Sequence, residues 1–201
     1  MIKKIHVQDV YAAEKIADDK HSWNVFVSLF DPSHKETIHR IADKNLKNNN
    51  SVRHHVELFQ DIDEEWMNRR AFTEEEVDGW IEDPFHYMQP GPSLEHISNI
   101  IELGKELIES EEEHNVLVHC HAGVSRSTAA AIILRYMNGE KEEEAILNTL
   151  EDRYCSWPNQ LMLRLADRLL KHYPPYKPSE LYEKVVAWKK AEKEKPFGAS
   201  F

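Results

Sequence analysis

The distribution of apolar and polar residues predicts four β-strands. The segment 52–59 alternates between apolar and polar positions, as a strand with one buried face does. The segment 115–120 (NVLVHC) is a continuous apolar run, typical of a strand covered on both faces. Two further strands are predicted over 2–7 and 22–30, the second ending at the turn signal Asp31-Pro32.

Apolar residues recur every three or four positions over most of the remaining chain, which predicts helices. Ser93 is a suitable N-cap for a strongly amphipathic run that follows it. Helices are expected over 9–19, 33–47, 93–108, 125–137, 141–153, 159–172 and 178–194. Strands and helices therefore alternate until the fourth strand, after which only helices follow. This order indicates an α/β fold with a mainly parallel central sheet of four or five strands, flanked by helices, and a helical C-terminal part.

The chain is expected to form one main domain over residues 1–175, followed by a C-terminal helix and tail over 176–201. The pair Pro174-Pro175 separates them. Residues 64–92 are rich in aromatic and acidic side chains and form an insertion before the fourth strand. This insertion either builds one wall of a cleft or packs as a lid on a small core of its own.

Charge and cysteine content exclude several classes of protein. The 25 basic and 36 acidic residues give a formal charge of −11, which disfavours binding to nucleic acid or to anionic membranes. Two cysteines are too few for a disulfide framework or a paired-cysteine zinc site. The N-terminus lacks the pattern of a signal peptide, and no apolar run is long enough to cross a bilayer. We therefore expect a cytoplasmic protein without a metal or other cofactor.

The segment 119–127 (HCHAGVSRS) carries the clearest chemistry. A strand ends at Cys120, a loop of five residues follows, and Arg126 opens an alanine-rich helix. Such a loop can turn successive backbone N–H groups inward, which makes an anion-binding nest at a helix N-terminus. The residues predicted to bind the anion with Arg126 are His121, Ala122, Gly123, Val124 and Ser125.

Each polar side chain of this segment has an expected role. Arg126 offers a planar donor fork suited to two phosphate oxygens. The positive potential of the nest favours the thiolate of Cys120, which can attack phosphorus in line and form a phosphocysteine. Ser127 can hydrogen-bond the sulfur as it leaves, and His119 can orient the start of the loop and support the thiolate. A metal site formed by Cys120 and its two flanking histidines is disfavoured, because adjacent strand residues point to opposite faces.

The segment resembles the signature of the protein tyrosine phosphatase superfamily, and its AGVSRS part is closest to the dual-specificity branch. The likeness extends weakly over residues 20–172 and includes Pro158-Asn159, a pair that braces the phosphate loop in this family. The resemblance implies a parallel central sheet, a phosphatase domain over 1–175, a two-step mechanism without metal, and an aspartic general acid on a separate loop. Cys155 is expected to be structural rather than a redox partner of Cys120.

The general acid has to come from a loop at the same edge of the sheet as Cys120. Asp61 and Asp63 follow the third predicted strand, Asp31 follows the second, and Asp83 lies nearer in sequence. In the family the acid follows the strand that precedes the cysteine strand, which implies Asp61 or Asp63, with Asp61 the closer match. The distance along the chain from Asp61 to Cys120 is longer than in compact members of the family.

The variable positions of the loop carry no Lys or Arg, whereas lipid and RNA-end phosphatases of the superfamily tend to have basic residues there. With the negative net charge, this favours a phosphorylated protein or peptide substrate carrying phosphotyrosine, with phosphoserine and phosphothreonine as further substrates. The alternatives are a phosphatase of the same fold acting on a small molecule, nucleotide or lipid, and a phosphate-binding module without turnover. No pattern in the chain predicts an oligomeric state.

Overall fold

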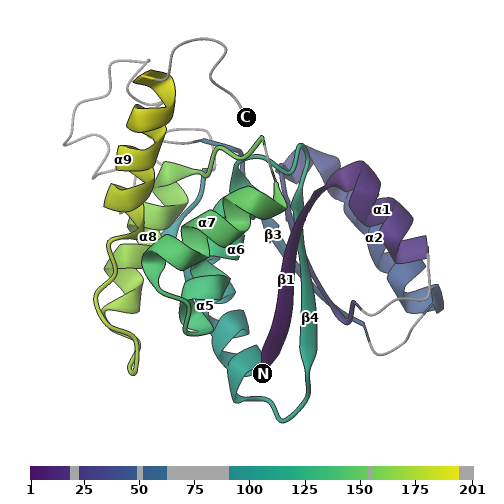
Figure 1. The fold of residues 1–201 in the computed structure, drawn as a ribbon. Helices are drawn as coiled ribbons and strands as arrows, with labels where there is room; N and C mark the ends of the chain where they lie inside the picture. The colour runs from purple at the N-terminus through teal and green to yellow at the C-terminus, as the bar shows by residue number, and fades with distance from the viewer. Residues whose placement is uncertain (19–22, 49–51, 63–90, 154, 195–201) are drawn as a thin grey trace.

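A parallel four-stranded sheet forms the centre of the protein (Figure 1). The computed structural model describes residues 1–18, 23–48, 52–62, 91–153 and 155–194. Within these ranges the strands lie in the order β1-β4-β2-β3, and every neighbouring pair is parallel. Their bounds are β1 (Ile2–Asp9), β2 (Val25–Phe30), β3 (Arg53–Leu58) and β4 (His114–Cys120). The predicted α/β class, and all four predicted strands, are confirmed.

Two layers of helices cover the sheet (Figure 1). One face is covered by α1 (Val10–Asp18) and α2 (Lys35–Asn48), the latter preceded by a short 3-10 turn (Pro32–His34). The other face is covered by α5 (Leu94–Glu109) and α6 (Arg126–Met137). The remaining described helices lie beyond them and are α7 (Glu142–Asp152), α8 (Gln160–Leu170) and α9 (Leu181–Glu194). Each predicted helix is present.

Side chains on β2 and β4 alternate between two apolar clusters, one under each layer of helices. Val116 and Val118 of β4 belong to the larger cluster, with α5 and α6, whereas Leu117 belongs to the smaller one, with α1 and α2. Both faces are therefore buried, as the continuous apolar sequence of β4 predicts. Burial also explains why α6 is rich in alanine, because this helix lies between the sheet and three other helices.

The helices that connect the strands lie on opposite faces of the sheet before and after the order of strands reverses at β4. Helix α1 leaves β1 over one face of the sheet, while α5 enters β4 over the other, and β4 lies between β1 and β2. Open α/β sheets bind ligands at such a switch point, beyond the carboxyl ends of the strands. The C-terminal end of β4, where Cys120 lies, is therefore the topologically favoured place for a site.

The C-terminal helix α9 packs against α7 and α8. Leu181 and Val185 are fully buried in the larger apolar cluster. The predicted insertion over 64–92 lies outside the described residues except for its last two positions. None of the described helices is both long enough and apolar enough to span a bilayer.

Candidate active site

The loop between β4 and α6 passes directly over the end of β1, and Gly123 makes this possible. Its φ of 68° lies in the left-handed region that favours glycine. A Cβ at this position would also lie 2.7 Å from the backbone of Gln8 and Asp9. Any larger residue would therefore strain the turn and force the loop away from β1.

Cys120 is the last residue of β4 and is 1% exposed. Its side chain lies on the face covered by α5 and α6, within the larger apolar cluster. The Sγ atom is 3.2 Å from the Oγ of Ser127, in the first turn of α6. The predicted contact between the Ser127 hydroxyl and the sulfur is thus present.

Arg126 is the first residue of α6 and is 3% exposed. Its Nη1 donates to the carbonyl of Phe59 at 2.7 Å, and its Nη2 donates to Asp31 Oδ2 at 3.2 Å. Its Nε lies 3.7 Å from Asp61 Oδ2. The guanidinium is therefore oriented by the loops that follow β2 and β3. It has five N–H donors, of which these two hydrogen bonds use two, so donors remain for an incoming anion.

Asp61, a candidate general acid, lies against the loop between β4 and α6. Its Oδ1 accepts a hydrogen bond from Ser125 Oγ at 2.7 Å and another from Asn159 Nδ2 at 3.0 Å. Asp31, the candidate that follows β2, also lies at this edge of the sheet and pairs with Arg126. The other two candidates, Asp63 and Asp83, lie outside the described residues.

Asn159 braces the loop from one side, which confirms the role implied by the resemblance. Its backbone N–H donates to the Ser125 carbonyl at 3.2 Å, and its side chain joins Asp61 to the Ile62 carbonyl. The N–H of Trp157 donates to the Val124 carbonyl at 2.8 Å. The segment before α8 thus holds both the loop and the candidate acid.

Asp9 and Arg153 brace the loop from the other side. Arg153 donates to Asp9 Oδ2 and to the Ala122 carbonyl, each at 3.0 Å. Burial raises the pKa of Asp9, but the hydrogen bonds from Ala12 and Arg153 and the charge of Arg153 outweigh it, so the pKa is lowered overall. Neither residue is among the site residues expected from the sequence. Asp9 ends β1 as Cys120 ends β4, a signal that could have identified it, whereas no local pattern distinguishes Arg153.

The His119 side chain points away from Cys120, as the alternation of strand residues predicts. Its imidazole lies on the opposite face of the sheet from Cys120, because adjacent residues of a strand alternate. It is 2.7 Å from Ser28 Oγ, and burial, together with the neighbouring His54, lowers its pKa to about 3. The ring is therefore neutral at physiological pH. The His119 ring is therefore connected to Cys120 through the backbone of β4 rather than through a contact with the sulfur.

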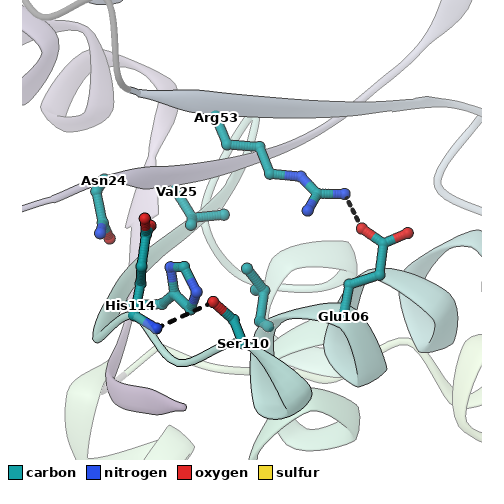
Figure 2. Close-up of a pocket in the computed structure, with 8 residues that line it drawn as sticks. Asn24, Val25, Arg53, Glu106, Ser110 and His114 are labelled. Carbon is teal, nitrogen blue, oxygen red and sulfur yellow. Dashed lines mark hydrogen bonds and ion pairs between the residues drawn. The ribbon is translucent and has the colours of Figure 1, made fainter.

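A cavity of about 350 Å³ lies at the opposite end of the sheet, where β2, β3 and β4 begin (Figure 2). Its lining includes Asn24, His114, and the ion pair between Arg53 and Glu106. No residue of the 119–127 segment lines this cavity. It is therefore separate from the loop that carries Cys120.

Two other expectations concern cysteine and metals. Cys155 is an exposed free thiol in the segment between α7 and α8. Across the described ranges, no group of three or more His, Cys, Asp or Glu side chains is arranged to hold a metal ion.

No protein family model and no curated protein sequence matches the chain. Among solved structures, Tk-PTP in its active form aligns over 85% of this chain and 93% of its own, with a TM-score of 0.51 and 15% identity. The PTP-2 phosphatase of Cydia pomonella aligns over 82% of this chain and 84% of its own, with a TM-score of 0.50 and 20% identity. The chain therefore has the fold of the protein tyrosine phosphatases.

Proposed function

We propose that the protein is a cysteine-dependent phosphatase with Cys120 as nucleophile. The observation that carries this proposal is the convergence of a buried thiol, the Ser127 hydroxyl and the Arg126 guanidinium around one loop at the N-terminus of α6. Backbone N–H groups and a helix N-terminus attract an anion, and the arginine fork adds directional donors. A phosphate bound there lies in reach of the sulfur.

In the first step, the Cys120 thiolate attacks phosphorus, forming a P–S bond while the P–O bond to the leaving group breaks. Asp61 donates a proton to the departing oxygen. Its Oδ1 accepts hydrogen bonds from Ser125 and Asn159, so the proton is carried by Oδ2, which lies 3.7 Å from Arg126 Nε. Arg126 and the loop N–H groups stabilise the charge on the transferring phosphoryl oxygens.

In the second step, water attacks the phosphocysteine and gives its proton to the Asp61 carboxylate. The P–S bond breaks and its electron pair returns to the sulfur. Ser127, 3.2 Å from Sγ, donates a hydrogen bond to the leaving thiolate. The residues of the loop, from His121 to Ser125, bind the phosphate throughout both steps.

The proposed substrate is phosphotyrosine in a protein or peptide, with phosphoserine and phosphothreonine as further substrates. Three features support it: the buried position of Cys120, the absence of Lys and Arg from loop positions 121–125, and the carboxylates of Asp31 and Asp61 beside the site. A buried thiol favours the long aryl phosphate of phosphotyrosine over the shorter phosphoserine and phosphothreonine, and nearby carboxylates repel highly anionic lipids and nucleotides.

Hydrolysis of p-nitrophenyl phosphate tests the reaction. We expect activity that is lost in Cys120→Ser, retained in the matched Cys155→Ser variant, and unchanged by chelators. Inactivity of the wild type, or full activity of Cys120→Ser, would overturn the proposal. Phosphate release from phosphotyrosine peptides, compared with inositol phosphates and phosphoinositide vesicles, tests the substrate class. Faster phosphate release from inositol phosphates or from phosphoinositide vesicles would contradict the proposal of a protein substrate.

A further inference from the structure

A single hydroxyl group links two histidines across three strands. Ser28 Oγ on β2 is 2.7 Å from Nε2 of His119 on β4 and 2.6 Å from Nε2 of His54 on β3. Ser28 and His119 are both fully buried and are register partners in neighbouring strands. His54 lies on β3, the outer strand of the sheet, and is half-buried. The three side chains form one continuous hydrogen-bonded row, His54–Ser28–His119.

The row lies in an apolar environment under α1 and α2. Phe30 packs edge-on against the His119 ring at 5.4 Å, and Phe26 packs edge-on against the His54 ring at 6.3 Å. Val10 and Ala13 of α1 and Ile41 of α2 belong to the same cluster. Hydrogen bonds in such a low-dielectric setting are strong, and breaking one leaves a buried polar group without a partner.

Both imidazoles are neutral at physiological pH. Burial, together with His54, lowers the pKa of His119 to about 3, although the charge of Asp9 opposes this. Burial, together with the neighbouring His55, lowers the pKa of His54 to about 4. The charged and titratable groups acting on the row are therefore Asp9 from β1 and His55 from β3, while the side chains that α1 and α2 contribute to the cluster are apolar.

The single hydroxyl proton of Ser28 couples the tautomers of the two histidine rings. The Ser28 hydroxyl has one hydrogen, so it donates to one Nε2 and accepts from the other. One ring must therefore carry its proton on Nε2 and the other on Nδ1. A ring that changes tautomer forces the opposite change in its partner or breaks the row. His119 Nδ1 has no hydrogen-bond partner among the described atoms. The hydrogen bond from Nε2 to Ser28 therefore fixes the tautomer of this ring.

We propose that Ser28 and His54 are positioning residues for the reaction at Cys120, because together they fix the orientation and tautomer of the His119 ring. This inference rests on the proposed phosphatase function. His119 immediately precedes the nucleophile, and β4 ends with it and Cys120. A His119 ring that is hydrogen-bonded to β2 restrains the end of β4, and so the direction in which Cys120 and the first loop N–H groups point.

The test combines kinetics with a readout of the His119 ring. In Ser28→Ala we expect kcat for p-nitrophenyl phosphate to fall about tenfold, the factor that one ordinary hydrogen bond is worth, with KM within twofold of wild type. The ¹⁵N spectrum of His119 should change from one neutral tautomer to a mixture, and alkylation of Cys120 by iodoacetate at pH 7 should slow.

Three variants separate positioning from stability. Thr149→Ala removes another fully buried hydroxyl, on α7, and should lower stability without changing kcat or the His119 spectrum. On the outer strand, His54→Gln keeps a hydrogen-bonding side chain and should retain most of the activity, whereas His54→Leu should behave as Ser28→Ala does. These two variants keep the test possible if Ser28→Ala fails to fold.

Two results would overturn the inference. One is a wild-type His119 spectrum and wild-type kcat in both Ser28→Ala and His54→Leu. The other is a loss of activity that follows the loss of stability equally in these variants and in Thr149→Ala. A wild-type protein without phosphatase activity would instead refute the proposed function, while the ring spectrum and the alkylation rate would still report on the row.

Discussion

The two ends of the sheet each hold an arginine beside a carboxylate, but in different surroundings. At the end of β4, Arg126 is 3% exposed and also donates to a backbone carbonyl. At the start of β3, the Arg53 side chain is 45% exposed and pairs with Glu106, whose side chain is 57% exposed. Exposed pairs contribute little because water screens them, whereas a buried guanidinium acts strongly on any neighbouring anion. Burial of the guanidinium, rather than charge pairing, distinguishes the end of the sheet where we propose the active site.

The largest effect on the hydrolysis of p-nitrophenyl phosphate is expected from Arg126→Lys, which keeps the charge and removes the planar fork. We expect kcat/KM for p-nitrophenyl phosphate to fall by at least about 10²-fold, the loss typical of a preorganised donor in the transition state. The matched Arg53→Lys variant should remain within twofold of wild type, because Arg53 lies at the opposite end of the sheet. Steady-state kinetics of both variants would measure the difference, and equal losses would contradict it.

The next effect distinguishes the carboxylates beside the two arginines. Asp61→Asn should lower kcat about 10²–10⁴-fold for substrates with a poor leaving group, and less for p-nitrophenyl phosphate, because it removes the proton donor. Glu106→Gln, at the other end, should leave kcat unchanged. Asp31→Asn should alter KM more than kcat, since Asp31 orients Arg126. A larger leaving-group dependence in Asp31→Asn than in Asp61→Asn would reassign the acid to Asp31.

The smallest effect concerns the stability of the loop end. The pKa of Asp9 is lowered below 3.8 in the fold, so its contribution to stability is present above that value and is lost as the pH falls through the folded-state pKa. Asp9→Asn should be less stable than wild type by about 1 kcal/mol at neutral pH, as for a partly exposed charged hydrogen bond. The two proteins should converge in strong acid.

Urea unfolding at a series of pH values would measure this convergence. The exposed Asp43 on α2 provides the control, and Asp43→Asn should follow wild type at every pH. A constant difference between Asp9→Asn and wild type across the series would show that the Asp9 charge does not stabilise the loop end.

Local patterns predicted the elements because each signal lies within a few residues. Neighbouring residues determine the periodicity of apolar positions and the capping of helices. These local features identify the apolar run of β4, the N-cap at Ser93 and the alanine-rich start of α6. The loop of segment 119–127 could be predicted for the same reason, since the strand, loop and helix that form it are consecutive in the sequence. Arg153 could not be found in this way, because its contact with Ala122 joins segments 31 residues apart.

The amino-acid sequence by itself determined the α/β order, the loop from His119 to Ser127 and the pairing of Cys120 with Ser127. The tertiary structure alone decided that Asp31 and Asp61 both reach Arg126, and that Arg153, paired with Asp9, holds the Ala122 carbonyl of the loop. The physical reason is that strand order and the placement of helices bring distant segments together at one edge of the sheet. Spacing along the chain carries no information about such contacts.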